Sequence, residues 1–398
     1  MDITLSSDQE LALKKITDWL REVQRRRENN EKFADIQYMT FGGFAGTGKT
    51  TIISVLLSRL DDIIETKDND FKYTQAMALT GRAALNMRKA MDERNVRVPH
   101  MEFSTIHRFL YKPVIEEGRV TSWEYDPIYT GSKLRLVIID EASMITRELF
   151  NDLRELRCPI LFVGDHGQLP PISGNLNLMQ NPEVKLETIH RQAQDSPIIR
   201  LSMMAREGRT IPIKDYSDIV KKIRSVEEVE HLVKNQDDFA FIVATNKARV
   251  KLNRSALTFM NLNQHEPQIN SRVICLKNNY NTEPFLFNGQ LGNICDIDRN
   301  GVDYEVSIKM EGNGHFNGII NGETFNTVKP DINDPMFHRN LPLFDFGYAM
   351  TCHKAQGSQF DRVFVFGSGF GTFDIRKRWL YTAITRAQNE LYICGDRV

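Results

Sequence analysis

A glycine-rich segment near residue 45 has the composition of a phosphate-binding loop. Residues 43–50 read GFAGTGKT and match the pattern G-x-x-x-x-G-K-[ST] in full. Glycines allow backbone N–H groups to curl around a phosphate where side chains would collide, and the helix that follows presents its positive end. Lys49 would bridge the β- and γ-phosphates of a nucleotide, and the Thr50 hydroxyl would bind Mg²⁺. The segment therefore predicts a nucleoside triphosphate site that uses Mg²⁺.

Two later segments carry groups that could act on a bound γ-phosphate. Asp140 and Glu141 follow the apolar run LRLVII at 134–139. At the end of a buried strand, Asp140 would hold Mg²⁺ through water, and Glu141 would orient or deprotonate the attacking water. Gln168 lies in the segment VGDHGQLPP at 163–171 and would contact the γ-phosphate or the attacking water. A polar turn fixed by Gly and Pro is the alternative interpretation of that segment.

The sequence also bears on the base of the nucleotide. The nearest match to the guanine-reading motif N-K-x-D is NKAR at 246–249, which lacks the aspartate. We therefore expect ATP rather than GTP.

These groups can meet only if a sheet brings strand ends together. Strands alternate with helical or loop segments, which is typical of a parallel sheet covered by helices. The apolar runs that predict strands are 38–41, 76–79, 136–139 and 160–163 in a first unit and 239–244, 363–366 and 391–394 in a second. A helix is expected from Lys49 onward. The sequence therefore predicts two α/β units.

The first predicted element is a helix over residues 7–27, after a Ser-Ser-Asp start that can cap a helix. Roughly helical spacing is seen in the apolar residues Leu11, Ile16, Leu20 and Val23. The end of the helix carries the basic cluster Arg21, Arg25, Arg26 and Arg27. Because charge runs are commonly exposed, we favour a solvated helix face over a phosphate contact for this cluster.

Two segments interrupt the alternation of strands and helices. Residues 110–133 contain two short β-like runs around a glycine turn and predict a β-hairpin inserted in the first unit. Residues 272–340 are rich in Asn and Gly and predict a small all-β insertion in the second unit.

Composition narrows the class of protein. The 398 residues include 51 Lys and Arg and 52 Asp and Glu, a net charge of −1, which excludes a globally cationic binder but not a local basic groove. No apolar run is long enough to span a bilayer, and the start MDITLSSDQE has no cationic segment before an apolar core. Five cysteines without a C-x-x-C pair argue against a disulfide framework or a zinc site. We therefore expect a cytoplasmic protein with no membrane contact.

The motifs, taken in order, closely resemble those of superfamily 1B DNA helicases, the group that includes RecD-like, Pif-type and phage Dda-like enzymes. The resemblance covers essentially the whole chain. Besides the segments above, the matching motifs are 7–9, 78–84, 104–107, 190–192, 196–208, 244–246 with Asn253, 348–358 and 381–387. The sequence departs from the family pattern at Leu79, where proline is usual, and at Gln359, where an acidic residue is often found.

The resemblance implies an α/β fold with two RecA-like parallel-sheet motor domains of the P-loop NTPase class. It also implies a β-hairpin insertion and a small SH3-like β insertion. The implied boundaries are 1–109 and 134–195 for motor domain 1A, 110–133 for hairpin 1B, 196–271 and 341–398 for motor domain 2A, and 272–340 for insertion 2B. A compact, monomeric member of the family is expected.

For the nucleotide site, the resemblance implies that Gln9 reads adenine and that Arg191 and Arg386 reach the γ-phosphate. An arginine supplied by a second domain would couple stabilisation of the transition state to domain closure. A surface ion pair is the alternative for Arg386. The implied catalytic residues are Lys49, Glu141, Gln168, Arg191 and Arg386. The implied ATP-binding residues are Gln9, Gly43, Ala45, Gly46, Thr47, Gly48, Lys49, Thr50, Thr51, Arg191 and Arg386, with Thr50 and Asp140 holding Mg²⁺.

For nucleic acid, the resemblance implies a channel lined by hydroxyls, backbone N–H groups and a few cations. The implied contacts are Thr80, Thr105, His107, Thr245, Asn246, Thr351, His353 and Lys354. In the hairpin, Trp123 and Tyr125 would stack on a base or meet the duplex junction as a separating pin. Ordinary hairpin packing is the alternative for these two aromatic residues.

The resemblance thus implies an ATP-dependent helicase that moves 5′→3′ on single-stranded DNA and unwinds duplex at junctions. Single-strand-binding or replication proteins are the expected partners, and a phage-encoded member would work in the host cytoplasm. Two other functions stay open from the residues: a DNA-stimulated translocase that separates strands poorly, and an ATP-switched loading subunit. RNA also stays open as the substrate, because phosphate contacts and stacking discriminate sugars weakly.

Overall fold

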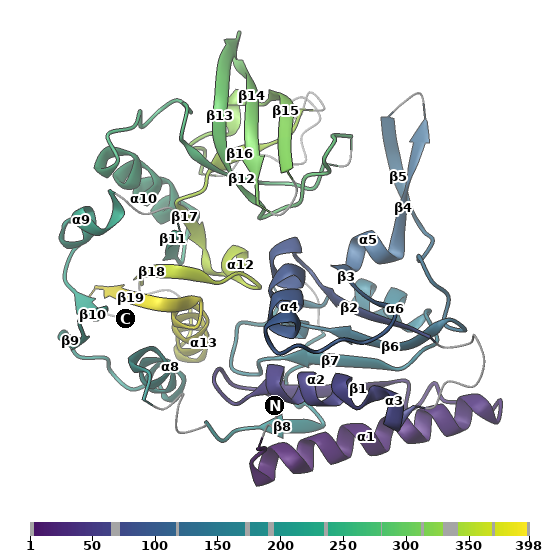
Figure 1. Cartoon of the computed structure of the whole chain (residues 1–398). Helices are drawn as coiled ribbons and strands as arrows, with labels where there is room; N and C mark the ends of the chain where they lie inside the picture. Colours follow the sequence, from purple (N-terminus) through teal and green to yellow (C-terminus); the bar gives the residue numbers. More distant parts are fainter. Residues whose placement is uncertain are drawn as a thin grey trace. The chain divides into compact units, whose positions relative to one another are not determined.

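The computed structural model describes residues 4–64, 72–116, 119–171, 176–189, 195–234, 238–279, 281–311, 314–328, 341–367 and 371–395. The chain divides into two compact units, Met1–Asp195 and Ser196–Val398 (Figure 1). Each unit is described by itself. Among the described residues, no helix has the length and apolar character needed to cross a membrane.

The first unit is built on a six-stranded sheet whose described pairings are all parallel. Its strands run in the order β3-β2-β6-β7-β1-β8. Their bounds are Tyr38–Gly43 (β1), Tyr73–Ala78 (β2), Met101–Thr105 (β3), Leu134–Ile139 (β6), Ile160–Gly164 (β7) and Val184–Leu186 (β8). The sequence predicts the four central strands but misses the two edge strands, since β3 and β8 are short and carry polar, partly exposed residues.

Helices cover both faces of this sheet. The helices are α1 (Ser7–Glu28), α2 (Lys49–Ser58), α3 (Leu60–Ile63) and α4 (Gly81–Glu93) on one face, and α5 (Ile106–Leu110) and α6 (Arg147–Arg154) on the other. Side chains of β6 alternate between the two cores, with Leu136 and Ile138 in one and Val137 and Ile139 in the other. Because both faces are buried, the strand reads as a continuous apolar run.

The first helix begins with a reciprocal cap. Ser6 Oγ accepts a hydrogen bond from the backbone N–H of Gln9, and Gln9 Oε1 accepts one from the N–H of Ser6. Its buried side includes Ile16 and Leu20. Leu11 is 55% exposed, so its predicted place on the apolar side is wrong, because the buried side turns through Ala12 instead.

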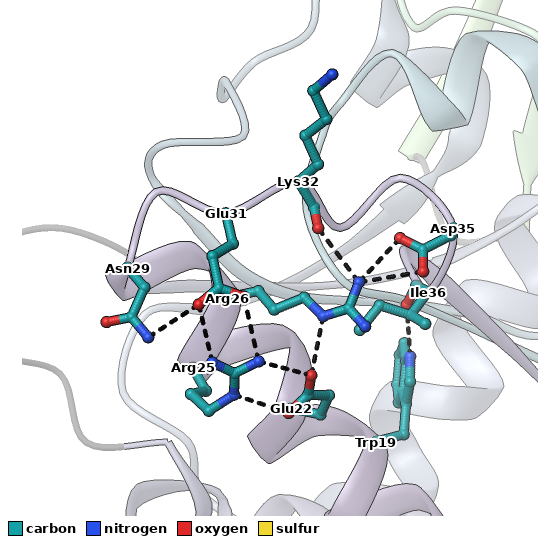
Figure 2. Close-up of polar contacts among 9 residues, drawn as sticks. All are labelled: Trp19, Glu22, Arg25, Arg26, Asn29, Glu31, Lys32, Asp35 and Ile36. Carbon is teal, nitrogen blue, oxygen red and sulfur yellow. Dashed lines mark hydrogen bonds and ion pairs between the residues drawn. The ribbon is translucent and has the colours of Figure 1, made fainter.

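Most of the basic cluster at the end of α1 is exposed and ion-paired (Figure 2). Arg25 pairs with Glu22 and Glu31, and Arg26 pairs with Glu22 and Asp35. These contacts fasten the loop after the helix to its last turns. Exposed pairs of this kind contribute little each, about 0–1 kcal/mol. Arg25 and Arg26 therefore have a local structural role (Figure 2).

Arg27 differs from the rest of the cluster, so the prediction of a solvated face is wrong for it. Its side chain is buried, and Nη2 donates to the carbonyl oxygens of Gly131 at 2.7 Å and Leu134 at 3.0 Å. Burial lowers the pKa of its guanidinium to about 10. Arg27 therefore joins α1 to the start of β6.

An antiparallel pair of strands, β4 (Tyr111–Glu116) and β5 (Arg119–Tyr125), projects from the first unit (Figure 1). Its base is fastened to α6: the Tyr111 hydroxyl donates to the carboxylate of Asp152, and the Tyr125 hydroxyl donates to the Asp152 carbonyl at 3.0 Å. The pair lies within the segment 110–133. The role of this strand pair as a strand-separating pin stays a prediction.

The second unit contains a six-stranded sheet in the order β17-β11-β18-β19-β10-β9. Neighbours are parallel except at β9, which is antiparallel to β10. The bounds are Asp215–Ser217 (β9), Val220–Ile223 (β10), Phe239–Val243 (β11), Ala349–Thr351 (β17), Phe360–Phe366 (β18) and Ala387–Cys394 (β19). The helices of this unit are α8 (Pro197–Glu207), α9 (Glu230–Val233), α10 (Asn246–Phe259), α12 (Cys352–Ala355) and α13 (Phe373–Ile384).

A five-stranded antiparallel sheet completes the second unit, in the order β15-β14-β13-β12-β16. Its strands are Arg272–Cys275 (β12), Leu291–Asn300 (β13), Asp303–Met310 (β14), Gly314–Ile320 (β15) and Phe344–Phe346 (β16). Because β16 pairs with β12, the sheet extends past residue 340, the predicted end of the insertion. Its SH3-like class stays a prediction.

The two sheets of the second unit share one hydrophobic core. Phe239 and Phe241 of β11 belong to the same buried cluster as Val273 of β12 and Phe344 of β16. A buried ion pair reinforces this contact: Arg249 of α10 binds Asp345 of β16. The five-stranded sheet is therefore packed onto the parallel sheet and does not form a separate core.

Candidate functional site

The glycine-rich loop joins β1 to α2 in a conformation that depends on its glycines. Gly46 and Gly48 have φ of 78° and 88°, in the left-handed region that favours glycine. A Cβ on Gly43 would lie 2.7 Å from Thr47 Oγ1 and 2.9 Å from Lys49 Cγ. The loop therefore folds tightly, with its backbone open to a ligand at the start of α2.

Side chains of this loop are held by its own carbonyl groups. Lys49 Nζ donates to the carbonyl oxygens of Gly43 at 2.6 Å and Phe44 at 3.1 Å, and Thr47 Oγ1 donates to that of Phe44 at 2.8 Å. Thr50 is exposed in the first turn of α2, and Thr51 of the same turn is half-buried, as is Ala45 of the loop. The ammonium group thus lies over the loop, within reach of a bound polyphosphate.

Gln9 is brought to the loop from α1. Its side chain is buried, and Nε2 donates to the carbonyl oxygen of Thr47 at 3.2 Å. Because the same side chain caps α1, Gln9 connects the start of that helix to the phosphate loop. Its contact with adenine stays a prediction.

The acidic pair follows β6, in the sheet that also holds β1. The backbone N–H of Asp140 donates to the Met77 carbonyl at 2.9 Å, and Asp140 Oδ1 accepts from the N–H of Glu141 at 2.8 Å. Glu141 has φ 53° and ψ 39°, a left-handed conformation that costs a residue with a side chain about 1–3 kcal/mol. Such strain is found at functional sites, where the surrounding contacts maintain it.

The glutamine turn follows β7, the strand between β6 and β1. Gln168 is buried, and its backbone N–H donates to the Asp165 carbonyl at 3.3 Å. Asp165 Oδ1 also accepts from the N–H of Gly167 at 2.8 Å. Since β6, β7 and β1 are adjacent and parallel, Asp140, Glu141, Gln168 and the phosphate loop all lie at the carboxyl edge of one sheet.

His166 is a residue of this site that the sequence reasoning missed. Its ring lies against that of Phe44 in the phosphate loop, with centroids 3.9 Å apart. Burial lowers the pKa of His166, so the imidazole is neutral near pH 7. The contact joins the phosphate loop to the glutamine turn. No pattern of residue spacing in the sequence predicts it.

Within the described residues, no cluster of three or more His, Cys, Asp or Glu side chains is arranged to hold a metal. Mg²⁺ does not need one, because it takes one or two protein oxygens and completes its shell with water and phosphate. The hydroxyl of Thr50 and the carboxylate of Asp140 are donors of the right chemistry for it.

Four threonines predicted to contact nucleic acid share one structural position. Thr80, Thr105, Thr245 and Thr351 are each the N-cap residue of a helix, at the end of a strand or two residues beyond it. The hydroxyls of the first three accept a backbone N–H of the helix. Helix N-termini expose further N–H groups and attract phosphate.

These positions repeat between the two units. The first sheet begins β3-β2 and the second begins β17-β11, and each of these strands is followed by a capped helix. Thr80 after β2 corresponds to Thr245 after β11, and Thr105 after β3 corresponds to Thr351 after β17. Each unit therefore presents two adjacent helix N-termini at one sheet edge, with Asn246 exposed on the first turn of α10.

The basic residues near these caps are more enclosed than expected. His107 of α5 and His353 of α12 have pKa values lowered by burial. Burial also lowers the pKa of Lys354 to about 8, and the nearby Arg249 guanidinium adds to the effect, while Asp345 opposes it. Lys354 therefore lies beside the buried ion pair of the second unit, and its contact with nucleic acid stays a prediction.

Of the two arginines predicted to reach the γ-phosphate, the structure describes Arg386. Arg386 lies just past the end of α13, whose C-cap residue is Thr385. Its guanidinium is buried and donates to the carbonyl oxygens of Thr382 at 3.1 Å and Ser358 at 3.3 Å, so it is no surface ion pair. Arg191 lies outside the described residues.

Two further predicted residues lie on the hairpin and on α10. Trp123 is half-buried opposite Pro113 in the β4–β5 pair. Asn253, matched to a family motif, is fully buried and has a structural role: Nδ2 donates to the Phe346 carbonyl at 3.0 Å, and Oδ1 accepts from the N–H of Ala349 at 2.7 Å.

Two family models match this chain. Residues 24–228 match the model described as AAA domain, which covers just over half of the chain, and residues 346–394 match the UvrD-like helicase C-terminal domain. The chain is 24% identical to the ATP-dependent RecD2 DNA helicase of Deinococcus radiodurans, over 95% of this chain and 51% of that protein. It belongs to the AAA-domain family, in the superfamily 1B group of RecD-like, Pif-type and Dda-like helicases.

Other members of the group show the same likeness over different lengths. The RecD subunit of the RecBCD enzyme of Buchnera aphidicola is 22% identical, over 89% of this superfamily 1B chain and 70% of the subunit. The ATP-dependent DNA helicase dda of Enterobacteria phage T4 is 27% identical over 43% of the chain and 38% of that protein. The chain thus spans about half the length of the RecD2 relative.

Solved structures confirm the helicase fold. A crystal structure of Bacteroides Pif1 bound to single-stranded DNA has a TM-score of 0.53 and 16% identity, covering 98% of this chain and 92% of that one. A structure titled for DNA unwinding at forked duplex by two coordinating Pif1 helicases has a TM-score of 0.51 at the same identity and coverage. The likeness supports RecA-like sheets in this family member, the first of which carries the P-loop.

Proposed function

We propose that this chain is an ATP-dependent DNA helicase that moves 5′→3′ along single-stranded DNA and separates duplex. The observation that carries the proposal is a repeated arrangement. Thr80 and Thr105 in the first unit, and Thr245 and Thr351 in the second, occupy the N-cap positions of helices that follow adjacent strands. The first unit also brings three hydrolysis motifs to one sheet edge. A single unit with this edge would bind ATP, whereas two units with matching strand-binding edges can pass a strand along.

At the nucleotide site, backbone N–H groups of the loop and Lys49 would hold the β- and γ-phosphates, and Gln9 would read the base. Bound Mg²⁺ would neutralise charge on the phosphate oxygens, held by Thr50 and through water by Asp140. Glu141 would take the proton of the attacking water, and Gln168 would contact that water or the γ-phosphate. The strained backbone at Glu141 supports this role.

Arg191 and Arg386 are proposed to stabilise the charge that develops on the γ-phosphate. An arginine at this position contributes about 10³–10⁵-fold to hydrolysis in related chemistry. Arg386 is held by two carbonyl groups of the second unit, so its guanidinium is oriented before it meets a phosphate. An arginine on the second unit would make hydrolysis depend on closure of the two units around ATP.

For the strand, the proposal assigns phosphates to the four capped helix ends, with Asn246, His107, His353 and Lys354 beside them. Neutral donors of this kind contact the backbone without reading sequence. Two relatives are named as DNA helicases, and the Pif1 structures contain or concern DNA, which supports DNA as the substrate. The 5′→3′ direction follows the family resemblance, and the hairpin with Trp123 is proposed as the separating pin.

The nucleotide part is tested by Lys49→Ala, with Lys14→Ala on the exposed side of α1 as the control. The account predicts that DNA-stimulated ATP hydrolysis falls at least about 100-fold, because the γ-phosphate loses its cation. Binding of a fluorescent single-stranded oligonucleotide should stay within twofold of wild type. Robust hydrolysis by Lys49→Ala would refute the assignment of the site.

A further inference from the structure

A stripe of cations runs along the exposed side of α10. Lys247, Lys251 and Arg254 are spaced by four and three residues, so they share one side of the helix, and all three are exposed. None of them forms an ion pair within 4 Å in the part of the chain that the structure describes. The Glu227 carboxyl lies near the stripe: its hydrogen bond with Ser225 and, to a smaller extent, the charge of Lys251 lower its pKa. The opposite side of α10, with Leu252 and Ala256, is buried in the core of the second unit.

This stripe forms one wall of a groove. The groove has a volume of about 460 Å³. Helix α10 also contributes Val250, Ser255 and Thr258 to its lining, and the remaining lining residues are Gln264, Asn326 and Val328. No carboxylate lines it. A ligand in the groove would meet positive charge along one wall and polar and apolar groups along the other.

The second wall is fixed by hydrogen bonds. Asn326 Nδ2 donates to the Gln264 carbonyl at 2.7 Å, and the N–H of Asn326 donates to Asp345 Oδ1 at 2.9 Å. Arg249 Nη2 donates to the Thr327 carbonyl at 2.8 Å. The buried Arg249–Asp345 pair therefore holds this wall in position, and the groove exists before any ligand binds.

The groove is continuous with the strand-binding edge proposed above. Thr245 caps α10, and Asn246 and Lys247 are its first two residues. A rise of about 1.5 Å per residue puts Arg254 roughly 10 Å beyond Lys247 along the helix axis. The three cations therefore lie along a short stretch of any strand that follows the helix axis.

We propose that this groove binds the sugar-phosphate backbone of single-stranded nucleic acid after the strand leaves the edge at Thr245. The inference rests on the proposed function, because the strand must first reach that edge. Each of the three cations can neutralise one phosphate, and the polar and apolar groups of the other wall can contact the sugars. The lining has no aromatic side chain for stacking on bases, so this contact is independent of sequence.

The test compares the full chain with the variant Lys247→Ala/Lys251→Ala/Arg254→Ala. Binding of 8-nucleotide and 20-nucleotide oligothymidylate is measured by fluorescence anisotropy at several salt concentrations. The control is Lys14→Ala/Lys15→Ala/Arg21→Ala, which removes the same charge from the exposed side of α1. ATP hydrolysis stimulated by the short oligonucleotide is measured for all three proteins.

Wild type and the α1 control should bind the long strand more tightly than the short one. The α10 variant should lose most of that difference, and its salt slope on the long strand should fall by about 2, since single strands release about 0.7 counterions per contact. Its affinity for the short strand and its hydrolysis should stay within twofold of wild type.

Two results would overturn the groove while leaving the proposed function intact. One is an α10 variant with an unchanged salt slope and long-strand affinity. The other is an equal loss in the α1 control, which would assign the effect to net charge. A wild-type chain that binds neither oligonucleotide would instead refute the proposed function, and the groove with it.

Discussion

At the residue scale, the nucleotide site depends on backbone conformations that few residues adopt. Gly46, Gly48 and Glu141 all have positive φ. Glycine adopts such a conformation readily, whereas Glu141 has a side chain. The backbone N–H of Glu141 donates to Asp140 Oδ1, and a glycine here would remove the carboxylate that is proposed to act on water. The need for glycine is visible in the sequence, whereas the strain at Glu141 is not.

Lys354 carries a residue-scale prediction about pH. Its pKa in the folded chain is about 8, against a usual value of 10.5, so the folded state binds this proton more weakly than the unfolded state does. The folded state therefore gains stability from this group as pH rises from about 8 to 10.5, and loses it again as pH falls from 10.5 to about 8. In Lys354→Met this dependence should disappear.

The measurement for Lys354 is the urea midpoint of wild type and Lys354→Met at pH 7, 8 and 9.5. Lys354→Met should be more stable than wild type at pH 7, and the difference between their urea midpoints should become smaller as pH rises. Parallel profiles for the two proteins would show that the lysine titrates normally and is not enclosed beside Arg249.

Residue types and spacing were enough to place the loop, the acidic pair and Gln168 after buried strands, because each motif is local in sequence; their roles stay predictions. Contacts between distant segments were not predictable in this way. The contact of Phe44 with His166 and that of Gln9 with the Thr47 carbonyl depend on packing across the sheet. Arg27 was misjudged for the same reason, since only the folded chain brings the Gly131 carbonyl to it.

At the scale of elements, the capped helices connect stability to the proposed strand contact. Thr245 Oγ1 accepts the N–H of Ala248 and so stabilises the first turn of α10. Thr245→Val should lower the free energy of unfolding by about 1 kcal/mol and weaken single-strand binding, because the cap and the hydroxyl are lost together. Thr245→Ser keeps the hydroxyl and should retain both.

The two readouts for Thr245 are a chemical denaturation curve and an oligonucleotide titration. If the valine variant binds the strand as tightly as the serine variant does, the Thr245 hydroxyl caps the helix but does not contribute to nucleic-acid binding. In that case the helix ends of the second unit would have a structural role alone.

The elements that the sequence missed have a common physical cause. Short edge strands such as β3, β8 and β17 bury only part of their side chains, so they lack the continuous apolar run that identified the central strands. The predicted end of the insertion failed at β16 because FDF at 344–346 pairs with a strand about seventy residues earlier. Pairing at that separation leaves no local signal.

At the scale of the whole molecule, the two units share strand order but differ in function. Both sheets present two capped helices at matching positions, yet only the first carries the glycine-rich loop. The second carries the five-stranded sheet on a shared core, so the groove along α10 belongs to a rigid part of that unit. A cycle of ATP binding and hydrolysis that moves one unit against the other would then move a strand held by both.

The most direct test of this account is unwinding of two otherwise identical duplexes, one with a 5′ single-stranded tail and one with a 3′ tail, in the presence of Mg²⁺ and ATP. The account predicts displacement from the 5′-tailed duplex alone, and none by Lys49→Ala. Opening of only the 3′-tailed duplex would contradict the proposed direction. Opening of neither, alongside strong DNA-stimulated hydrolysis, would contradict strand separation as the function of this chain.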